Sequence, residues 1–174
     1  MVTKVAPASA LFLLLACGSS TDAMSPGGSS GAGCTLTVSG ATAGSYGCTS
    51  RSASSSDTTG LGYVMMGYGT AGQTIPAIGV SFTFPDVPMP GTFTDADVDA
   101  GTTARISVTA GDAAWAATDG TPAPTTGTYT LVLARATPTK VAAEGVVYAV
   151  SGSLDATLPP VPSTAATGNV TLHA

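Results

Sequence analysis

The sequence predicts an all-β domain, an antiparallel β-sandwich of about eight or nine short strands, with a closed β-barrel as the alternative. From residue 34 onward apolar residues recur mostly with a period of two, as in strands that bury one face. The most frequent residues are small or β-branched, with many glycines and prolines to form turns. Apolar residues make up 44% of the chain and charged residues only 9%, which excludes a disordered protein.

Four strands are expected in the first half of this domain. Their residues are 34–39, 46–48, 61–66 and 78–84. In the first and the last, apolar side chains alternate with Ser, Thr or Gly, which is typical of a strand with one buried face. The third is a continuous apolar run and predicts a strand buried on both faces. The polar residues 49–60 predict a loop between the second and third strands.

The second half predicts strands of the same kind. Their residues are 104–109, 129–133, 148–158 and 170–174, with a bulge expected near Gly152. The segment AAWAA at 113–117 is ambiguous, because Ala favours a helix whereas Trp115 is suited to point from a strand into the core.

The charge of the chain argues against a nucleic-acid partner. Its formal net charge is −5, whereas binding to phosphates requires a basic surface. The few basic residues do not cluster in the sequence. They are Lys4, Arg51, Arg105, Arg135 and Lys140.

Residues 1–16 are typical of a secretory signal peptide. The Met1 amine and Lys4 provide a positive start, and an apolar stretch follows, roughly from residue 5 to residue 15. This stretch is too short for a permanent transmembrane helix, which needs about 20 residues. We therefore expect the protein to be exported.

The end of this leader, Leu14-Leu15-Ala16-Cys17, resembles the lipobox of bacterial lipoproteins. The resemblance implies cleavage after Ala16, a diacylglyceryl thioether on Cys17, and the new amine as a further acylation point. Several acyl chains on one residue anchor a protein stably in a membrane. Gly18 follows in place of the Asp that retains enteric lipoproteins at the inner membrane, which implies the outer membrane.

The leader, the tether and the folded domain divide the chain into residues 1–16, 17–33 and 34–174. Residues 18–33 are rich in Gly and Ser and are typical of a flexible linker with a root-mean-square reach of about 20–24 Å. Such a tether is long enough to hold a domain clear of the lipid headgroups.

The cysteine count agrees with this division. If Cys17 carries lipid, Cys34 and Cys48 are left as a pair in an oxidising compartment, where disulfides persist. A disulfide closing this short loop would stabilise the domain by about 3 kcal/mol. The alternative, a metal-binding or catalytic cysteine, has little support because the chain contains only one His.

The last third of the chain carries a second resemblance. The segments GTYTL at 127–131, SGSLDATLPPVP at 151–162 and GNVTLHA at 168–174 resemble small secreted lipoproteins of Gram-negative bacteria that have no assigned activity. The resemblance therefore implies a location and no reaction.

The strongest candidate for a ligand site is the acidic segment 95–101, in which Asp95, Asp97 and Asp99 alternate with other residues. Acids spaced two apart in a loop can direct oxygens at Ca²⁺, as in an EF-hand. The glycine falls one place late, however, and Ile106 stands where that loop needs a Glu. A solvated acidic turn or edge strand, with the three acids on one face, is the alternative.

Two glycine-rich motifs match known functional patterns but lack the flanking structure that those patterns require. GYGTAG at 67–72 fits a dinucleotide-binding loop, but the residues that follow contain Pro76 and alternate like a strand rather than forming a helix. A Gly-rich hairpin turn explains it better. GGSSG at 27–31 fits a serine-hydrolase elbow with Ser29 as nucleophile, but it lies in the expected tether.

The remaining candidates are isolated residues. His173, the only His, is expected on the outward face of the last strand, where it cannot form a zinc site alone. Glu144 and Asp155 would make a carboxylate pair only if the fold brought them together. Core packing is favoured over a sugar-stacking platform for the aromatic residues. These are Trp115, Tyr63, Tyr68, Tyr129 and Tyr148.

The sequence thus predicts a lipid-anchored, non-catalytic structural or interaction module of the cell envelope. Its membrane contact is the lipid anchor, its protein or glycan partner is unspecified, and no cofactor is expected apart from the Ca²⁺ already considered. The alternatives are a secreted hydrolase using Asp95, Asp97, Asp99 or Asp155, and an adhesion module stabilised by Ca²⁺.

Overall fold

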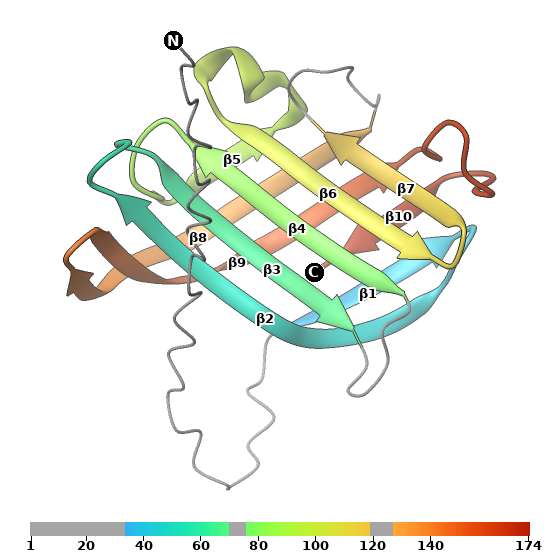
Figure 1. Ribbon diagram of the computed structural model, residues 1–174, viewed down its shortest axis with the longest axis horizontal. Helices are drawn as coiled ribbons and strands as arrows, with labels where there is room; N and C mark the ends of the chain where they lie inside the picture. Colours follow the sequence, from blue (N-terminus) through green and yellow to red (C-terminus); the bar gives the residue numbers. More distant parts are fainter. Residues whose placement is uncertain (1–33, 70–75, 119–126) are drawn as a thin grey trace, which may run out of the picture. The chain divides into compact units, whose positions relative to one another are not determined.

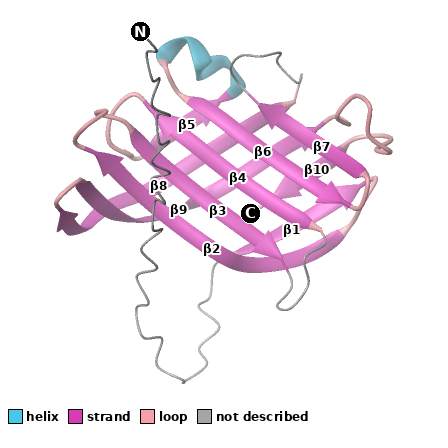
Figure 2. Ribbon diagram, viewed as in Figure 1, coloured by secondary structure: helices cyan, strands magenta, loops and turns pink. Residues whose placement is uncertain are grey.

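Ten β-strands and one short 3₁₀ helix, η1, make up the part of the computed structural model that is described, residues 34–69, 76–118 and 127–174 (Figure 2). In chain order they are β1 (Thr35–Gly40), β2 (Gly44–Ser56), β3 (Gly62–Gly69), β4 (Ala77–Phe84), β5 (Gly91–Thr94), η1 (Asp95–Ala100), β6 (Thr103–Ala110), β7 (Ala113–Thr118), β8 (Thr128–Ala142), β9 (Gly145–Leu158) and β10 (Val170–His173). The pairings between these strands are antiparallel. The predicted all-β, antiparallel fold is confirmed, although its described strands are more numerous and two of them much longer than expected.

The strands form one sheet that folds over on itself into two layers (Figure 1). Their hydrogen-bonded order is β5-β8-β9-β10-β1-β2-β3-β4-β6-β7. We call β2, β3, β4, β6 and β7 the front layer, and β5, β8, β9, β10 and β1 the back layer. The strands of the two layers cross at a clear angle in the view of Figure 1.

One side of the sandwich is closed by β2. Residues 44–47 of this strand pair with β1, and residues 54–56 pair with β9. The other edge of β2 pairs with β3, with an irregularity between Cys48 and Ser50. A bulge of this kind bends a strand and increases its twist. Since β2 has partners in both layers, it joins them.

The opposite side is closed by the segment that follows β9. Trp115 of β7 forms a bridge with Pro160. The Ala116 amide donates to the Pro159 carbonyl at 3.2 Å, and the Val161 amide donates to the Ala114 carbonyl at 2.8 Å. These bonds cover the free edge of β7, which would otherwise offer unpaired backbone groups to other chains. The architecture therefore lies between the predicted sandwich and its barrel alternative.

Alternate side chains of both layers fill the space between them. On β4 the four apolar residues expected to share a face, at 78, 80, 82 and 84, are all buried. Phe82 makes an edge-to-face contact with Tyr129 of β8 at 5.4 Å between ring centroids, and Phe84 makes one with Phe93 of β5 at 4.9 Å. Edge-to-face aromatic pairs add about 0.5–1.5 kcal/mol to the effect of burial alone.

The expected loop at 49–60 is wrong, because β2 continues to Ser56. Its serine-rich sequence has low intrinsic strand propensity, but β3 and β9 supply partners for its backbone. The turn begins only at residue 57.

The run at 61–66 is not buried on both faces, as its apolar sequence predicted. Val64 is buried, whereas Met65 is 53% exposed and Tyr63 is half-buried. The outer face of the front layer has no described element covering it in Figure 1, so alternate residues of β3 face outward. Two large apolar side chains are thereby placed on a solvent-facing sheet surface.

The ambiguous segment at 113–117 forms strand β7, with Trp115 buried in the core. The two long strands, β8 and β9, pair along most of their length, and the pairing shifts between Leu133 and Arg135, opposite Gly152. The bulge expected near Gly152 therefore exists, but its extra residue lies on β8. A Cβ added to Gly152 would collide with the carbonyl oxygen of Val132.

This close approach makes Gly152→Ala a test of the β8–β9 register. We expect the substitution to lower the free energy of unfolding by about 1–3 kcal/mol, because the backbone must shift to admit the methyl group. Gly47→Ala is the matched control, since a Cβ at Gly47 meets no atom within 4 Å. Urea unfolding of both variants measures the difference, and equal stability would contradict the register.

Candidate functional site

Several predicted sites lie outside the described residues. These are the signal peptide, the lipidation residue Cys17, the tether and Ser29. The GYGTAG motif lies partly outside: Gly67 and Gly69 belong to strand β3, and the next three residues are not described.

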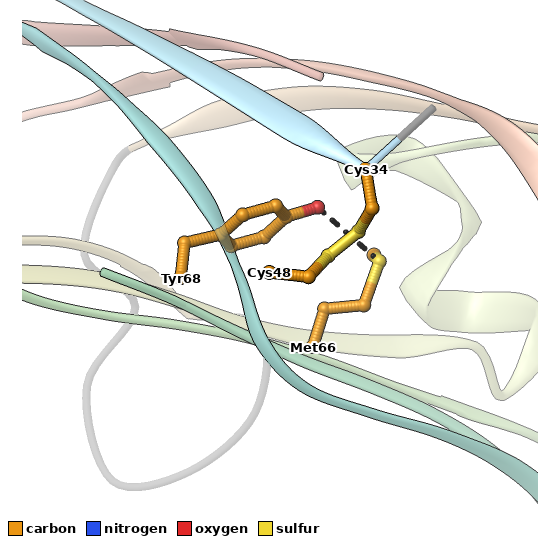
Figure 3. Close-up of a disulfide and its surroundings, with 4 residues drawn as sticks. All are labelled: Cys34, Cys48, Met66 and Tyr68. Carbon is orange, nitrogen blue, oxygen red and sulfur yellow. Dashed lines mark hydrogen bonds between the residues drawn. A yellow bond between two sulfur atoms is a disulfide. The ribbon is translucent and has the colours of Figure 1, made fainter. Parts of the chain in front are cut away.

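The predicted disulfide between Cys34 and Cys48 is present (Figure 3). Their Cα atoms are 5.5 Å apart, within the usual range for a disulfide. The Cys48 amide also donates to the Cys34 carbonyl at 3.0 Å. The bridge therefore joins the residue that precedes β1 to β2, next to the irregularity between Cys48 and Ser50.

Tyr68 and Met66 of β3 lie beside this disulfide in Figure 3. The Tyr68 hydroxyl donates to Sδ of Met66 at 3.3 Å. Burial raises the pKa of the Tyr68 phenol above its ordinary value, so the hydroxyl keeps its proton through the neutral range. Both residues pack against the core, which indicates a structural role.

The acidic segment forms the helix η1 and not the expected turn or edge strand. Asp95 and Asp97 consequently do not share one face, because residues two apart in a 3₁₀ helix point in different directions. Oδ1 of Asp95 accepts a bond from the Tyr129 amide at 3.4 Å, whereas Oδ2 of Asp97 accepts one from the Thr94 amide at 2.5 Å. The side chain of Asp99 lies outside the described part. No group of three or more His, Cys, Asp or Glu that could hold a metal occurs among the described residues.

Asp97 belongs to a capping box. The Thr94 hydroxyl donates to Oδ2 of Asp97 at 3.1 Å and accepts from the Ala96 amide at 3.3 Å, while Asp97 accepts the Thr94 amide. A Thr followed three residues later by an acid is the sequence signal for this arrangement. That signal, in the segment TDAD at 94–97, explains the acid at Asp97 better than calcium does.

His173 lies on the surface, as expected, but it contacts Asp155. Nδ1 of His173 and Oδ1 of Asp155 are 2.5 Å apart, and the two side chains are 69% and 62% exposed. The residues are cross-strand neighbours on β10 and β9, so only the strand register could reveal the pair. On the flanking strands, Thr130 of β8 pairs with Asp155, and Thr37 of β1 pairs with His173. Glu144, which was considered as a carboxylate partner of Asp155, lies just before the start of β9, whereas Asp155 lies near the end of that extended strand. The fold therefore does not bring the two carboxylates together.

The five aromatic residues considered for sugar stacking are not gathered on one surface. Trp115, Tyr68 and Tyr129 are buried in the core. Nε1 of Trp115 donates to the Gly168 carbonyl at 2.9 Å. Only Tyr63 and Tyr148 are partly accessible, and they lie on β3 and β9.

A groove crosses the outer face of the front layer, and we call it the front groove. Its volume is about 470 Å³, and it is shallow and open to solvent. It is lined by residues of β2, β3, β4 and β6. They are Ser50, Arg51, Ser52, Met65, Met66, Gly67, Gly79, Val80, Ser81, Arg105 and Ser107.

The strand register explains the shape of the front groove. One row across the sheet runs Ser52, Met65, Ser81, Arg105, and the next runs Ser50, Gly67, Gly79, Ser107. The paired glycines leave the centre of the second row without side chains. Alternation in the sequence predicted Arg105 and Gly79 as outward residues, but the rows depend on pairings between distant segments.

The front groove has one cationic side chain on its outward face. Arg105 is exposed there, and the lining residues include no acid. Arg51 is also exposed, but it pairs with Met66 in the row of Val80, so the strand register directs it to the inward face. Neither arginine forms an ion pair with an acid of the described residues. The chain as a whole carries a formal charge of −5.

Comparison with known proteins adds no family assignment: no family model, no curated protein and no solved structure matches the chain. Within the described residues, no helix has the length and apolar character needed to cross a membrane.

The disulfide predicts a redox-dependent stability. Replacing Cys34 and Cys48 together by Ser should lower the free energy of unfolding by about 3 kcal/mol, because the unfolded chain regains the entropy of the open loop. Melting of the wild type with and without a thiol reductant measures the same effect. The reduced wild type should match the double variant, and insensitivity to both changes would contradict a structural disulfide.

The capping box predicts the behaviour of η1. Asp97→Ala should destabilise the domain by about 1 kcal/mol, whereas Asp97→Asn, which keeps an acceptor oxygen, should cost less. Millimolar Ca²⁺ should leave the melting temperature of the wild type unchanged, because Asp95 and Asp97 bond to different backbone amides. A clear rise with Ca²⁺ would restore the calcium hypothesis.

Proposed function

We propose that this protein is a lipoprotein of the bacterial cell envelope whose all-β domain is a non-catalytic binding module. The observation that carries the proposal is the Cys34–Cys48 disulfide. It pairs two of the three cysteines of the chain and suits an oxidising compartment outside the cytoplasm. The remaining cysteine is Cys17, which ends the Leu-Leu-Ala-Cys motif of the leader.

The parts of the chain have complementary roles in this proposal. Acyl chains on Cys17 hold the protein in the membrane, and the Gly/Ser-rich residues 18–33 separate the domain from the lipid by about 20–24 Å. Gly18 in place of Asp favours the outer membrane. The resemblance of the last third of the chain to small secreted lipoproteins agrees with this location.

The described domain has properties that suit binding at a rigid surface. Residues 44–56 of β2 and the segment after β9 close two sides of the sandwich, whereas β5 and residues 135–142 of β8 pair along one edge only. On the closed part of the sandwich, recognition depends on the side chains that the layers display. The front groove is one such surface, and Arg105 is exposed on it.

Cys17→Ser tests the anchor. We expect the wild type, extracted from the envelope, to begin at Cys17 and to carry acyl groups, and the variant to accumulate uncleaved without lipid. Labelling with an alkyne fatty acid and intact-mass analysis give both results. Ser19→Ala is the matched control, because it changes the neighbouring tether and leaves the motif intact.

The same mass spectrum can refute the proposal. A wild-type chain that begins at another residue and carries no lipid would mean that the leader is an ordinary signal peptide or is retained. A mass lower than that of the reduced chain by two hydrogen atoms is expected from the disulfide in either case.

A further inference from the structure

We propose that a hollow at one end of the sandwich, which we call the end pocket, binds a small primary amine with an apolar body. Residues 84–87, 89, 92, 93, 97 and 102 line it. The inference gives the binding module a ligand class, so it rests on the proposed function. Its grounds are a buried hydroxyl without a partner, the hydrogen-bond acceptors that line the same hollow, and apolar walls.

The end pocket lies where the chain crosses between the layers. The loop after β4 leads from the front layer to β5 in the back layer, and η1 leads from β5 toward β6. Figure 1 shows η1 at one end of the sandwich. The end pocket has a volume of about 270 Å³ and is partly open to solvent. Since a cavity of about 150 Å³ can hold benzene, there is room for one ring with a short arm.

A buried hydroxyl favours a polar ligand. Thr102 lines the end pocket and is only 3% exposed, and its hydroxyl forms no hydrogen bond with the described residues. It directly precedes Thr103, which pairs with Thr83. One step further along both strands, Thr102 is therefore level with Phe84, whose side chain faces the core. Since buried polar side chains almost always have a hydrogen-bond partner, a polar ligand would supply the one that Thr102 lacks.

The carboxylate of Asp97 favours a cation. Its Oδ2 accepts both bonds from Thr94, whereas its Oδ1 accepts no bond from the described residues. A second acid, Asp86, also lines the end pocket, and none of the residues that line it is basic. A hydrogen bond between an ammonium group and a carboxylate is about twice as strong as one between neutral groups. An amine that is protonated at neutral pH is therefore preferred over a neutral or anionic ligand.

The backbone of Thr92 supplies another acceptor. Within the described residues β5 pairs with β8 alone, so its other edge is free. The Thr94 amide donates to Asp97 instead of to β8. Because hydrogen-bonded and non-hydrogen-bonded residues alternate in antiparallel strands, the backbone of Thr92 points to the free edge, as that of Thr94 does. Its carbonyl is therefore available to a ligand beside β5.

These groups match a primary ammonium group. Such a group has three N–H donors and no acceptor. The end pocket offers three kinds of acceptor, which are Oδ1 of Asp97, the Thr92 carbonyl and the Thr102 hydroxyl. Phe93, which is half-buried, and Met89, which is 55% exposed, provide apolar walls for the body of the ligand. An amine on an aromatic ring therefore suits both parts of the lining.

Three other occupants fit less well. Ca²⁺ takes about six to eight oxygen ligands, whereas most of the surface of the end pocket is apolar. An anion would be repelled by Asp86 and Asp97. An added peptide strand would find few free backbone groups, because β5 has only four residues and Asp97 already accepts the Thr94 amide. A small amine meets none of these difficulties.

The experiment titrates benzylamine into the isotope-labelled, full-length protein extracted in detergent, and NMR follows the backbone amide signals. We expect saturable binding, with the largest signal changes at residues of the end pocket. Benzyl alcohol keeps the ring and loses the charge, so it should bind at least about tenfold more weakly. Benzyltrimethylammonium keeps the charge and has no N–H donor, so it should also bind more weakly. Nα-acetyl-lysine amide tests whether the amine is a lysine side chain of another protein.

Three variants locate the interaction. Asp97→Asn keeps an acceptor for the Thr94 amide and loses the charge, so it should fold and bind at least about tenfold more weakly. Thr102→Val should weaken binding about fivefold without lowering the melting temperature, because its hydroxyl has no partner in the protein to lose. Asp112→Asn, which changes an exposed acid outside the end pocket, should bind like the wild type.

Each outcome decides the proposal. Absence of benzylamine binding, equal binding of benzyl alcohol or benzyltrimethylammonium, or unchanged affinity in both Asp97→Asn and Thr102→Val would overturn it. Tighter binding of the lysine derivative would assign the end pocket to a protein partner instead. Lipidation is scored separately by mass. An unlipidated protein that binds benzylamine refutes the anchor alone, and a lipidated protein that does not bind it refutes the end pocket alone.

Discussion

The path of β2 is the constraint on which the rest of the domain depends. This strand pairs with β1 near its start, with β9 near its end and with β3 along its other edge, so one strand belongs to both layers. The disulfide attaches Cys48 of β2 to Cys34 at the beginning of the domain. If β2 did not bend, the sheet would remain open and the apolar faces of the two layers would be exposed to water.

Because the sandwich is closed, one face of each strand packs in the core and the other faces solvent. Inward residues form one apolar core in which β4 meets β8 and β5 through aromatic contacts. Outward residues are mostly small and polar, and they carry little of the folding energy. The outer face of the front layer can therefore hold features that weaken a strand, such as Gly67 and Gly79 side by side, without loss of the core. The front groove therefore lies on a face whose side chains are not constrained by packing of the core.

Much of the fold could be predicted because strand alternation is local. The apolar residues of β4 identify their own buried face, and the pairing of Cys34 with Cys48 followed from the count of cysteines. The failures share one cause. The strand conformation of the serines of β2, and the exposure of Tyr63 and Met65, can be predicted only when the strands that pair with them are known. The acids of η1 were misread in a different way, because the signal for a capping box at Thr94 and Asp97 was present in the sequence and overlooked.

The sequence by itself determined which side chains of the alternating strands, such as β4, face the core, where the disulfide forms, and which segment is expected to anchor the chain. These properties depend on residues close together along the chain, whose period of two or whose motif is visible without the fold. Only the tertiary structure decided that Asp155 meets His173 and that Met65, Gly79 and Arg105 line one groove. Each of these groupings joins strands distant in sequence, and a shift of one residue in any pairing would turn the side chains to the opposite face.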